Sequence, residues 1–315
     1  MNRRQFLGFA TSVALGHFSR ATTSGTSPEV AFTFDDPTLE GGAGLHWQEI
    51  NDRILHALSA RRLRAILFVT GKRIDEREGT QLISQWDQAG HAIANHSYSH
   101  LYFNTTRTEG GGNTTLAEFE ADAVRNEPLI SKYRHFTRLF RFPYFKEGDT
   151  LEKRDGMRLF LRKHGYRIGR ASIDASDWAI STRMEAHAKQ NPRGNLTPYR
   201  DFLLEHIWER SQFYDSLSRR LLGRSVRHTV VLHHNPLNAL FLADLMVMFT
   251  TEGWKLVDSE YAYSDEIYNS QPRILPAGES LIWALAKESG RFERDLRYPG
   301  EDDVYENPKM DALRL

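Results

Sequence analysis

The 315-residue chain contains no cysteine. That absence excludes disulfides, thiolate metal sites and cysteine nucleophiles, so any bound metal must be held by histidine, aspartate or glutamate. The sequence also lacks an excess of either charge, because lysine plus arginine and aspartate plus glutamate both number 41. Nucleic-acid-binding proteins normally carry a basic excess or stripe, so we expect no nucleic-acid partner.

A long hydrophobic run is missing from the N-terminus as well. RRQFL at residues 3–7 precedes a weakly apolar run to Leu15, and His17 interrupts it. This run is too short to span a bilayer, but the pattern resembles a twin-arginine export signal. We therefore expect residues 1–26 to be an export signal, and the mature protein to be periplasmic or extracellular without stable membrane insertion.

Strand-like and helix-like stretches alternate from Glu29 onward. EVAFTF (29–34) and RAILFVTG (64–71) read as buried strands, whereas Leu45–Arg62 has apolar residues at helical spacing. Repeated strand–helix units predict a parallel sheet with helical crossovers. Seven or so units in about 230 residues favour a closed or nearly closed barrel over an open sheet. The predicted fold is α/β, a distorted (β/α) barrel of seven or eight units.

The character of the sequence changes near its C-terminus. We predict the barrel over residues 28–262 and an extension over residues 263–315 that packs on it. The extension has several prolines and one short predicted helix at 278–290. The sequence assigns it no function.

Polar residues follow several of the predicted strands, where a barrel of this type places its reactive groups. His96 and His100 are four residues apart, so on a helical turn their imidazoles could share one metal ion. Capping or hydrogen-bonding histidines are the alternative. A carboxylate from another strand end would complete a set of two histidines and one carboxylate, which leaves room for water and substrate.

Five short motifs carry a family resemblance. They are TFDD (33–36), HSYSH (96–100), RFPY (141–144), DASDW (174–178) and VLHH (231–234). In this order they resemble the motifs of the polysaccharide deacetylase (NodB-homology) family, carbohydrate esterase family 4. The resemblance extends from about Val30 to Tyr261 and implies a distorted (β/α) barrel.

The resemblance implies a role for the two adjacent acids after the first strand. Asp36, His96 and His100 would hold a divalent metal, zinc above all, and Asp35 would be the base that takes a proton from water. Because side chains alternate along a strand, we expect the two carboxylates to point apart unless the strand ends there. Arg141 would orient Asp35 through a charge-assisted hydrogen bond.

The remaining motifs would supply the acid and the acyl pocket. His234 would protonate the leaving amine, and Asp177 would hydrogen-bond it and raise its pKa. His233 would be a packed strand histidine that points the other way. Trp178 and Leu232 would line the acyl pocket, although Trp178 could equally be a core aromatic. A backbone N–H near Tyr144 would stabilise the oxyanion.

The sequence departs from the family pattern beside these motifs. Pro37 and Phe145 stand where glycine is common, and Asn235 where aspartate often follows the catalytic histidine. Insertions at Glu40–Gly44 and Asn104–Asn113 fall where substrate loops of barrels lie. We expect these changes to alter which substrate the protein accepts more than which reaction it catalyses.

Together these features predict a metal-dependent hydrolase that acts on a carbon–nitrogen bond other than a peptide bond. It would remove acetyl groups from N-acetylated sugars of a polysaccharide or cell-wall glycan. The alternatives are a hydrolase of a small non-sugar amide or imide, or a non-catalytic carbohydrate-binding barrel. The last would be expected to lack a metal ligand or the base, and all of these residues are present.

Overall fold

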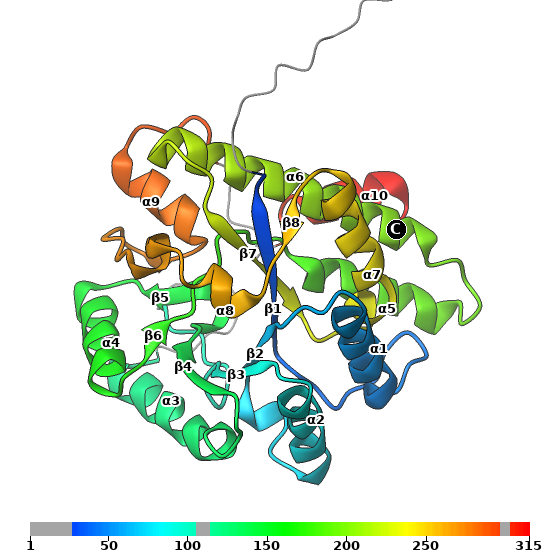
Figure 1. Cartoon of the computed structure of the whole chain (residues 1–315), viewed down its shortest axis with the longest axis horizontal. Coiled ribbons are helices and arrows are strands. Elements are labelled where there is room, and N and C mark those ends of the chain that lie inside the picture. The colour runs from blue at the N-terminus through cyan, green and yellow to red at the C-terminus, as the bar shows by residue number, and fades with distance from the viewer. Residues whose placement is uncertain (1–26, 105–113, 297–302) are drawn as a thin grey trace, which may run out of the picture.

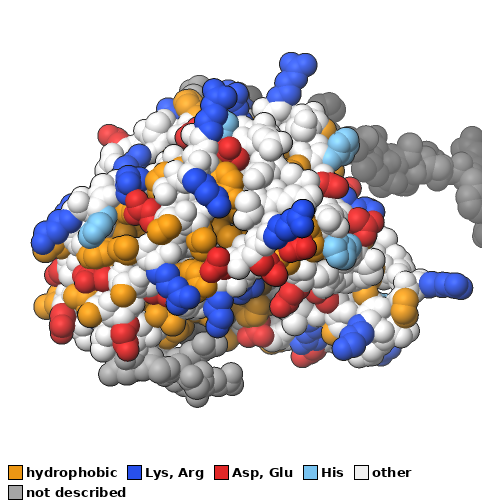
Figure 2. Space-filling model, turned by 90° about the horizontal axis from the view of Figure 1, so that it is seen from below, with side chains coloured by type: hydrophobic (Ala, Val, Ile, Leu, Met, Phe, Trp, Pro, Cys, Tyr) orange, Lys and Arg blue, Asp and Glu red, His pale blue; other side chains and the backbone are white. Residues whose placement is uncertain are grey.

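The computed structural model describes residues 27–104, 114–296 and 303–315. The predicted export signal and nearly all of the predicted insertion at 104–113 lie outside these residues. Of the helices described, none is both long and apolar enough to cross a membrane. On the face seen from below, basic and acidic side chains are interspersed among hydrophobic ones (Figure 2).

A parallel sheet forms the centre of the molecule (Figure 1). Its strands in spatial order are β6 (Arg167–Ile168), β4 (Phe136–Phe140), β3 (Ala92–Asn95), β2 (Ile66–Val69), β1 (Glu29–Asp35) and β7 (Arg227–His233), and β8 (Lys255–Leu256) also pairs with β1. The sheet curls, so that Ile173, after β6, forms a parallel bridge with Val230 of β7. The predicted distorted barrel is confirmed as a curled half-barrel with helices around it.

Helices surround the sheet (Figure 1), and the first seven in the described part of the chain lie between its successive strands. These seven are α1 (Trp47–Ala60), α2 (Arg77–Gln88), α3 (Leu116–Ile130), α4 (Leu151–Lys163), α5 (Asp177–Gln190), α6 (Thr197–Leu222) and α7 (Pro236–Thr251). The helices that follow the sheet are α8 (Ser259–Ala262), α9 (Leu281–Ser289) and α10 (Glu306–Leu313). The sequence pattern does not reveal α5, because its buried face includes Ala179, Ser181 and Ala188 in place of a continuous stripe of large apolar side chains.

Alternation along β1 decides which side chains face the helices and which face the barrel interior. Phe32 packs against Phe249 of α7, and Phe34 packs against Trp86 of α2, with ring centroids 5.9 and 5.5 Å apart. Thr33 and Asp35 must therefore point into the barrel. Because the strands are parallel, their carboxyl ends gather at one edge of the barrel, where Asp35 lies.

The segment after residue 262 contacts the barrel closely. Strand β9 (Ala277–Gly278) pairs antiparallel with β5 (Lys146–Gly148), which follows the turn after β4. Leu281 and Ile282 of α9 belong to the main hydrophobic core.

Candidate active site

Two buried carboxylates mark the end of β1. Asp35 is the last residue of the strand, and Asp36 has a φ of 56°, a left-handed conformation that aspartate tolerates better than most residues. Because the strand ends at Asp35, alternation along the strand does not set the direction of the Asp36 side chain. Asp35 Oδ2 lies 3.7 Å from His96 Nε2, and Asp36 Oδ2 lies 3.3 Å from His100 Nε2.

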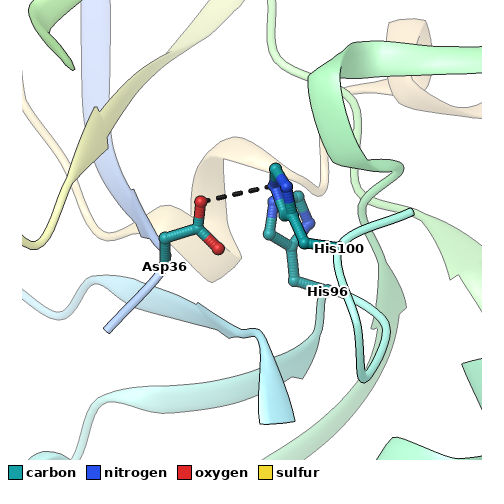
Figure 3. Close-up of side chains that lie close together, drawn as sticks. All are labelled: Asp36, His96 and His100. Carbon is teal, nitrogen blue, oxygen red and sulfur yellow. Dashed lines mark ion pairs between the residues drawn. The ribbon is translucent and has the colours of Figure 1, made fainter. Parts of the chain in front are cut away.

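The two histidines lie on a loop after β3, and the predicted helical turn is absent. Ser97 and His100 both have positive φ values, of 64° and 56°. The loop is held by the buried Asp122 of α3, whose Oδ2 accepts hydrogen bonds from the backbone N–H groups of Tyr98 and Ser99. These bends bring the imidazole centroids of His96 and His100 to 5.0 Å (Figure 3). Sequence reasoning missed Asp122, since nothing local connects an acid in a helix to this loop.

Asp36, His96 and His100 form a candidate metal site. One potential ligand atom from each lies within 4.8 Å of the others. The Nδ1 of His96 donates to the Arg141 carbonyl oxygen at 2.9 Å, which leaves the Nε2 lone pair for a metal. Thr70 Oγ1 donates to Asp36 and fixes that carboxylate. Two imidazoles and one carboxylate with positions left open are a donor set that suits zinc or a similar divalent ion.

The protonation states of these three residues favour metal binding. Burial lowers the pKa of both His96 and His100 to about 4, so their imidazoles are neutral at pH 7. Burial alone would raise the pKa of Asp36, but His100, His96 and Arg73 outweigh it and hold that pKa well below its usual range. All three groups are therefore in the form that binds a cation.

Arg141 and Asp35 form a buried ion pair beside the metal site. Arg141 is 1% exposed, and its Nη1 lies 2.6 Å from Asp35 Oδ1. The same Nη1 donates to Thr33 Oγ1 at 2.9 Å, and Nε donates to the Gly169 carbonyl oxygen at 2.8 Å. Burial raises the pKa of Asp35 to about 6 although Arg141 opposes that shift. Asp35 is thus a fixed carboxylate whose pKa lies close to neutrality.

The partner of Asp177 is His233, and the predicted hydrogen bond to His234 is wrong. His233 Nδ1 donates to Asp177 Oδ1 at 2.7 Å. The reason is strand register: His233 pairs with Asp35 across β1 and β7, so both side chains point into the barrel. His234 points outward, where its ring lies 6.5 Å from that of Trp86 and its Nε2 bonds to Asn51 Oδ1.

The environments of the two histidines set their charge. Burial would lower the pKa of His233, but Asp177, Asp35 and Asp36 together raise it to about 9. Burial lowers the pKa of His234 to about 4. At pH 7, His233 is a charged imidazolium at the site edge and His234 is a neutral residue of the core.

Asp177 is fully buried and receives several hydrogen bonds. Its Oδ2 accepts from the backbone N–H of His233 at 2.9 Å, from Asn235 Nδ2 at 3.0 Å and from Asn238 Nδ2 at 2.6 Å. The Asn235 side chain also accepts from the Asn238 N–H and caps α7. Asn235, which departs from the family pattern, thus connects the Asp177 carboxylate to the first turn of α7.

Not all residues of the predicted acyl pocket lie at the edge of the barrel where Asp35 lies. Leu232 is fully buried in the main core and pairs in register with Phe34, so it faces the helices and not the site. Its assignment to the pocket is therefore wrong for the same reason of register. Tyr144 has a φ of 56°, and its ring centroid lies 4.5 Å from that of His100. Trp178 is half-buried in the first turn of α5 and stays a prediction.

Comparisons with known proteins agree with this architecture. Residues 22–168 match the family model described as polysaccharide deacetylase. Curated proteins provide no match. Among solved structures, a mutant of a carbohydrate esterase family 4 pseudoenzyme, with restored activity, is 17% identical, with a TM-score of 0.51 over 75% of this chain and 68% of that one.

Two further solved structures are similar. The wild-type form of the same pseudoenzyme, from Bacillus anthracis, is 16% identical, with a TM-score of 0.51 over 75% of this chain and 66% of that one. The peptidoglycan deacetylase PdaC from Bacillus subtilis is 18% identical, with a TM-score of 0.48 over 75% of this chain and 90% of that one. At such identities the pseudoenzyme structures show a shared fold. The N-terminal half of this barrel, with Asp35, Asp36, His96, His100 and Arg141, thus resembles polysaccharide deacetylases in sequence as well as in fold.

Proposed function

We propose that the protein is a metal-dependent hydrolase that removes acetyl groups from an N-acetylated glycan. The observation that carries this proposal is the convergence of three groups at one edge of the barrel. These are the Asp36, His96 and His100 cluster, the Asp35–Arg141 ion pair and the His233–Asp177 pair. Each matches a different requirement of amide hydrolysis.

A divalent ion such as zinc, held by Asp36, His96 and His100, would supply a Lewis acid that lowers the pKa of water and polarises the acyl oxygen. Asp35 takes the proton from the attacking water as its oxygen bonds to the acyl carbon. A carboxyl pKa of about 6 leaves Asp35 ionised at pH 7 and basic enough to accept that proton. Arg141 keeps the carboxylate aimed at the site.

His233 acts as the general acid in place of His234. Its imidazolium donates a proton to the nitrogen as the carbon–nitrogen bond breaks, so the amine leaves neutral. A pKa of about 9 keeps the proton on His233 through neutral pH. As the family resemblance implies, a backbone N–H in the turn at Tyr144 would stabilise the oxyanion.

We further propose that residues 1–26 direct export and that the substrate is a cell-wall or other extracellular glycan. The wild-type pseudoenzyme structure with this fold indicates that the fold can exist without activity. In this chain, however, both the base Asp35 and the three candidate ligands are present. A small non-sugar amide as substrate is the remaining alternative.

The test is acetate release by zinc-loaded protein from chitooligosaccharides, peptidoglycan and acetylated xylan. We expect release from at least one N-acetylated glycan, and we expect it to stop with a chelator and in Asp35→Asn. Release from none of them by folded, metal-loaded protein would contradict the glycan assignment and favour the non-sugar amide.

A further inference from the structure

A tyrosine outside the family motifs contacts the buried arginine of the site. Tyr263 follows α8 and lies beyond residues 22–168, which match the family model. It is 3% exposed. Arg141 Nη2 donates to the Tyr263 hydroxyl at 2.9 Å, and that hydroxyl donates to the Arg170 carbonyl oxygen at 2.9 Å.

The direction of these two hydrogen bonds is fixed by the chemistry of the groups. A phenol has one hydrogen and a guanidinium has no acceptor, so the hydroxyl must donate to Arg170 and accept from Arg141. Burial raises the pKa of Tyr263, which keeps that hydrogen in place. We propose that Tyr263 is a positioning residue that holds the Arg141 guanidinium, and through it the Asp35 carboxylate, in the geometry for proton transfer. This inference rests on the proposed function.

The group that anchors Tyr263 is itself held rigidly. Arg170 donates to both oxygens of Glu147, at 2.6 and 2.7 Å, and Arg158 donates to the same carboxylate at 2.8 Å. Arg170 Nη1 also donates to the Ser270 carbonyl oxygen at 2.9 Å. Arg170 and Glu147 are each 3% exposed, so this cluster is screened from water and fixes the carbonyl that receives the Tyr263 hydrogen.

The same C-terminal segment also fixes the turn that follows Arg141. The Glu279 N–H donates to the Phe145 carbonyl oxygen at 3.0 Å, and Lys146 Nζ lies 2.6 Å from Glu279 Oε1. Gly278 has a φ of 122°, and a Cβ there would clash with the Phe145 carbonyl oxygen, so only glycine fits. The segment from Tyr263 to Glu279 therefore supports the arginine from one side and its turn from the other.

The test compares two phenylalanine variants of the full chain. Tyr263→Phe removes only the hydroxyl that accepts from Arg141. Tyr268→Phe is the matched control, because its ring centroid is 4.7 Å from that of Tyr263 and its buried hydroxyl bonds to Arg227 and Thr229 instead. We expect Tyr263→Phe to lower kcat by about 10- to 100-fold with KM and bound metal unchanged. Tyr268→Phe should lower thermal stability comparably and leave kcat within about twofold.

An activity-independent measurement separates this inference from the proposed function. The side-chain ¹⁵N–¹H signal of Arg141, assigned by its loss in Arg141→Lys, should shift in Tyr263→Phe and stay in place in Tyr268→Phe. If the wild type releases no acetate from any substrate, the proposed function fails while this spectrum still decides the contact. An unshifted Arg141 signal, or an equal loss of kcat in both variants, would overturn the positioning role.

Discussion

Replacing Asp177 with asparagine should move the alkaline limb of the pH–rate profile. His233 has a pKa of about 9 against an ordinary value of 6.5, a difference of roughly 3 kcal/mol between its two protonation states. Burial opposes that shift, and Asp177 is the largest of the groups that produce it. A bound divalent cation would offset the effect of Asp35 and Asp36 on the pKa of His233. Asp177 would then cause most of the remaining increase in that pKa.

The assay is the pH dependence of kcat/KM for metal-loaded protein. As the general acid must be protonated, activity should fall as pH rises through the pKa of His233. In Asp177→Asn that fall should begin at least about 1 pH unit lower. His234→Asn is the control, because His234 lies in the core against Asn51 and should affect stability alone. A limb that moves in His234→Asn and stays in place in Asp177→Asn would refute the assignment of the acid.

The same pair makes a separate prediction for the metal-free protein. Because folding raises the pKa of His233, its contribution to stability is complete below about pH 6.5 and is lost as pH rises through about 9. Urea unfolding of the wild type should therefore show a decrease in the free energy of unfolding across this interval. The decrease should be smaller in Asp177→Asn, and equal slopes in the two proteins would contradict the coupling.

Three further predictions concern the metal site and the base. His96→Gln and His100→Gln should each lose the metal on dialysis, and elemental analysis that finds one ion per chain would exclude the ligand assignment. Asp35→Asn should keep the metal and lose turnover. In the metal-free state, a folded pKa of about 6 against 3.8 means that the stability of the wild type falls as pH rises through 6, and urea titrations of the variant should lack this fall. Thr70→Val removes the hydroxyl that donates to Asp36 and should weaken zinc binding about 10- to 100-fold by competition titration, whereas unchanged affinity would show that the contact is dispensable.

The alternation of strands and helices and the family motifs were sufficient to predict the parallel barrel and the groups at its edge. The signals behind these two predictions are local in the sequence, because a buried strand is a short apolar run and a motif is a short string of residues. The capping box of α3 is local in the same way, because Thr115 and Glu118 are close in the chain and bond to each other. Helix α5 was missed because small residues on its buried face hide the periodicity.

The family motifs predicted that Asp35, Asp36, His96, His100, Arg141 and Asp177 lie together at one edge of the barrel. The motifs could not choose between His233 and His234. Side chains of neighbouring residues on a strand point to opposite faces of the sheet, but this rule does not tell which of the two points into the barrel. That choice depends on the register between β1 and β7, which are almost 200 residues apart in the chain and place His233 opposite Asp35. The contact between Tyr263 and Arg141 was hidden for the same reason, because no local pattern joins residues 122 positions apart.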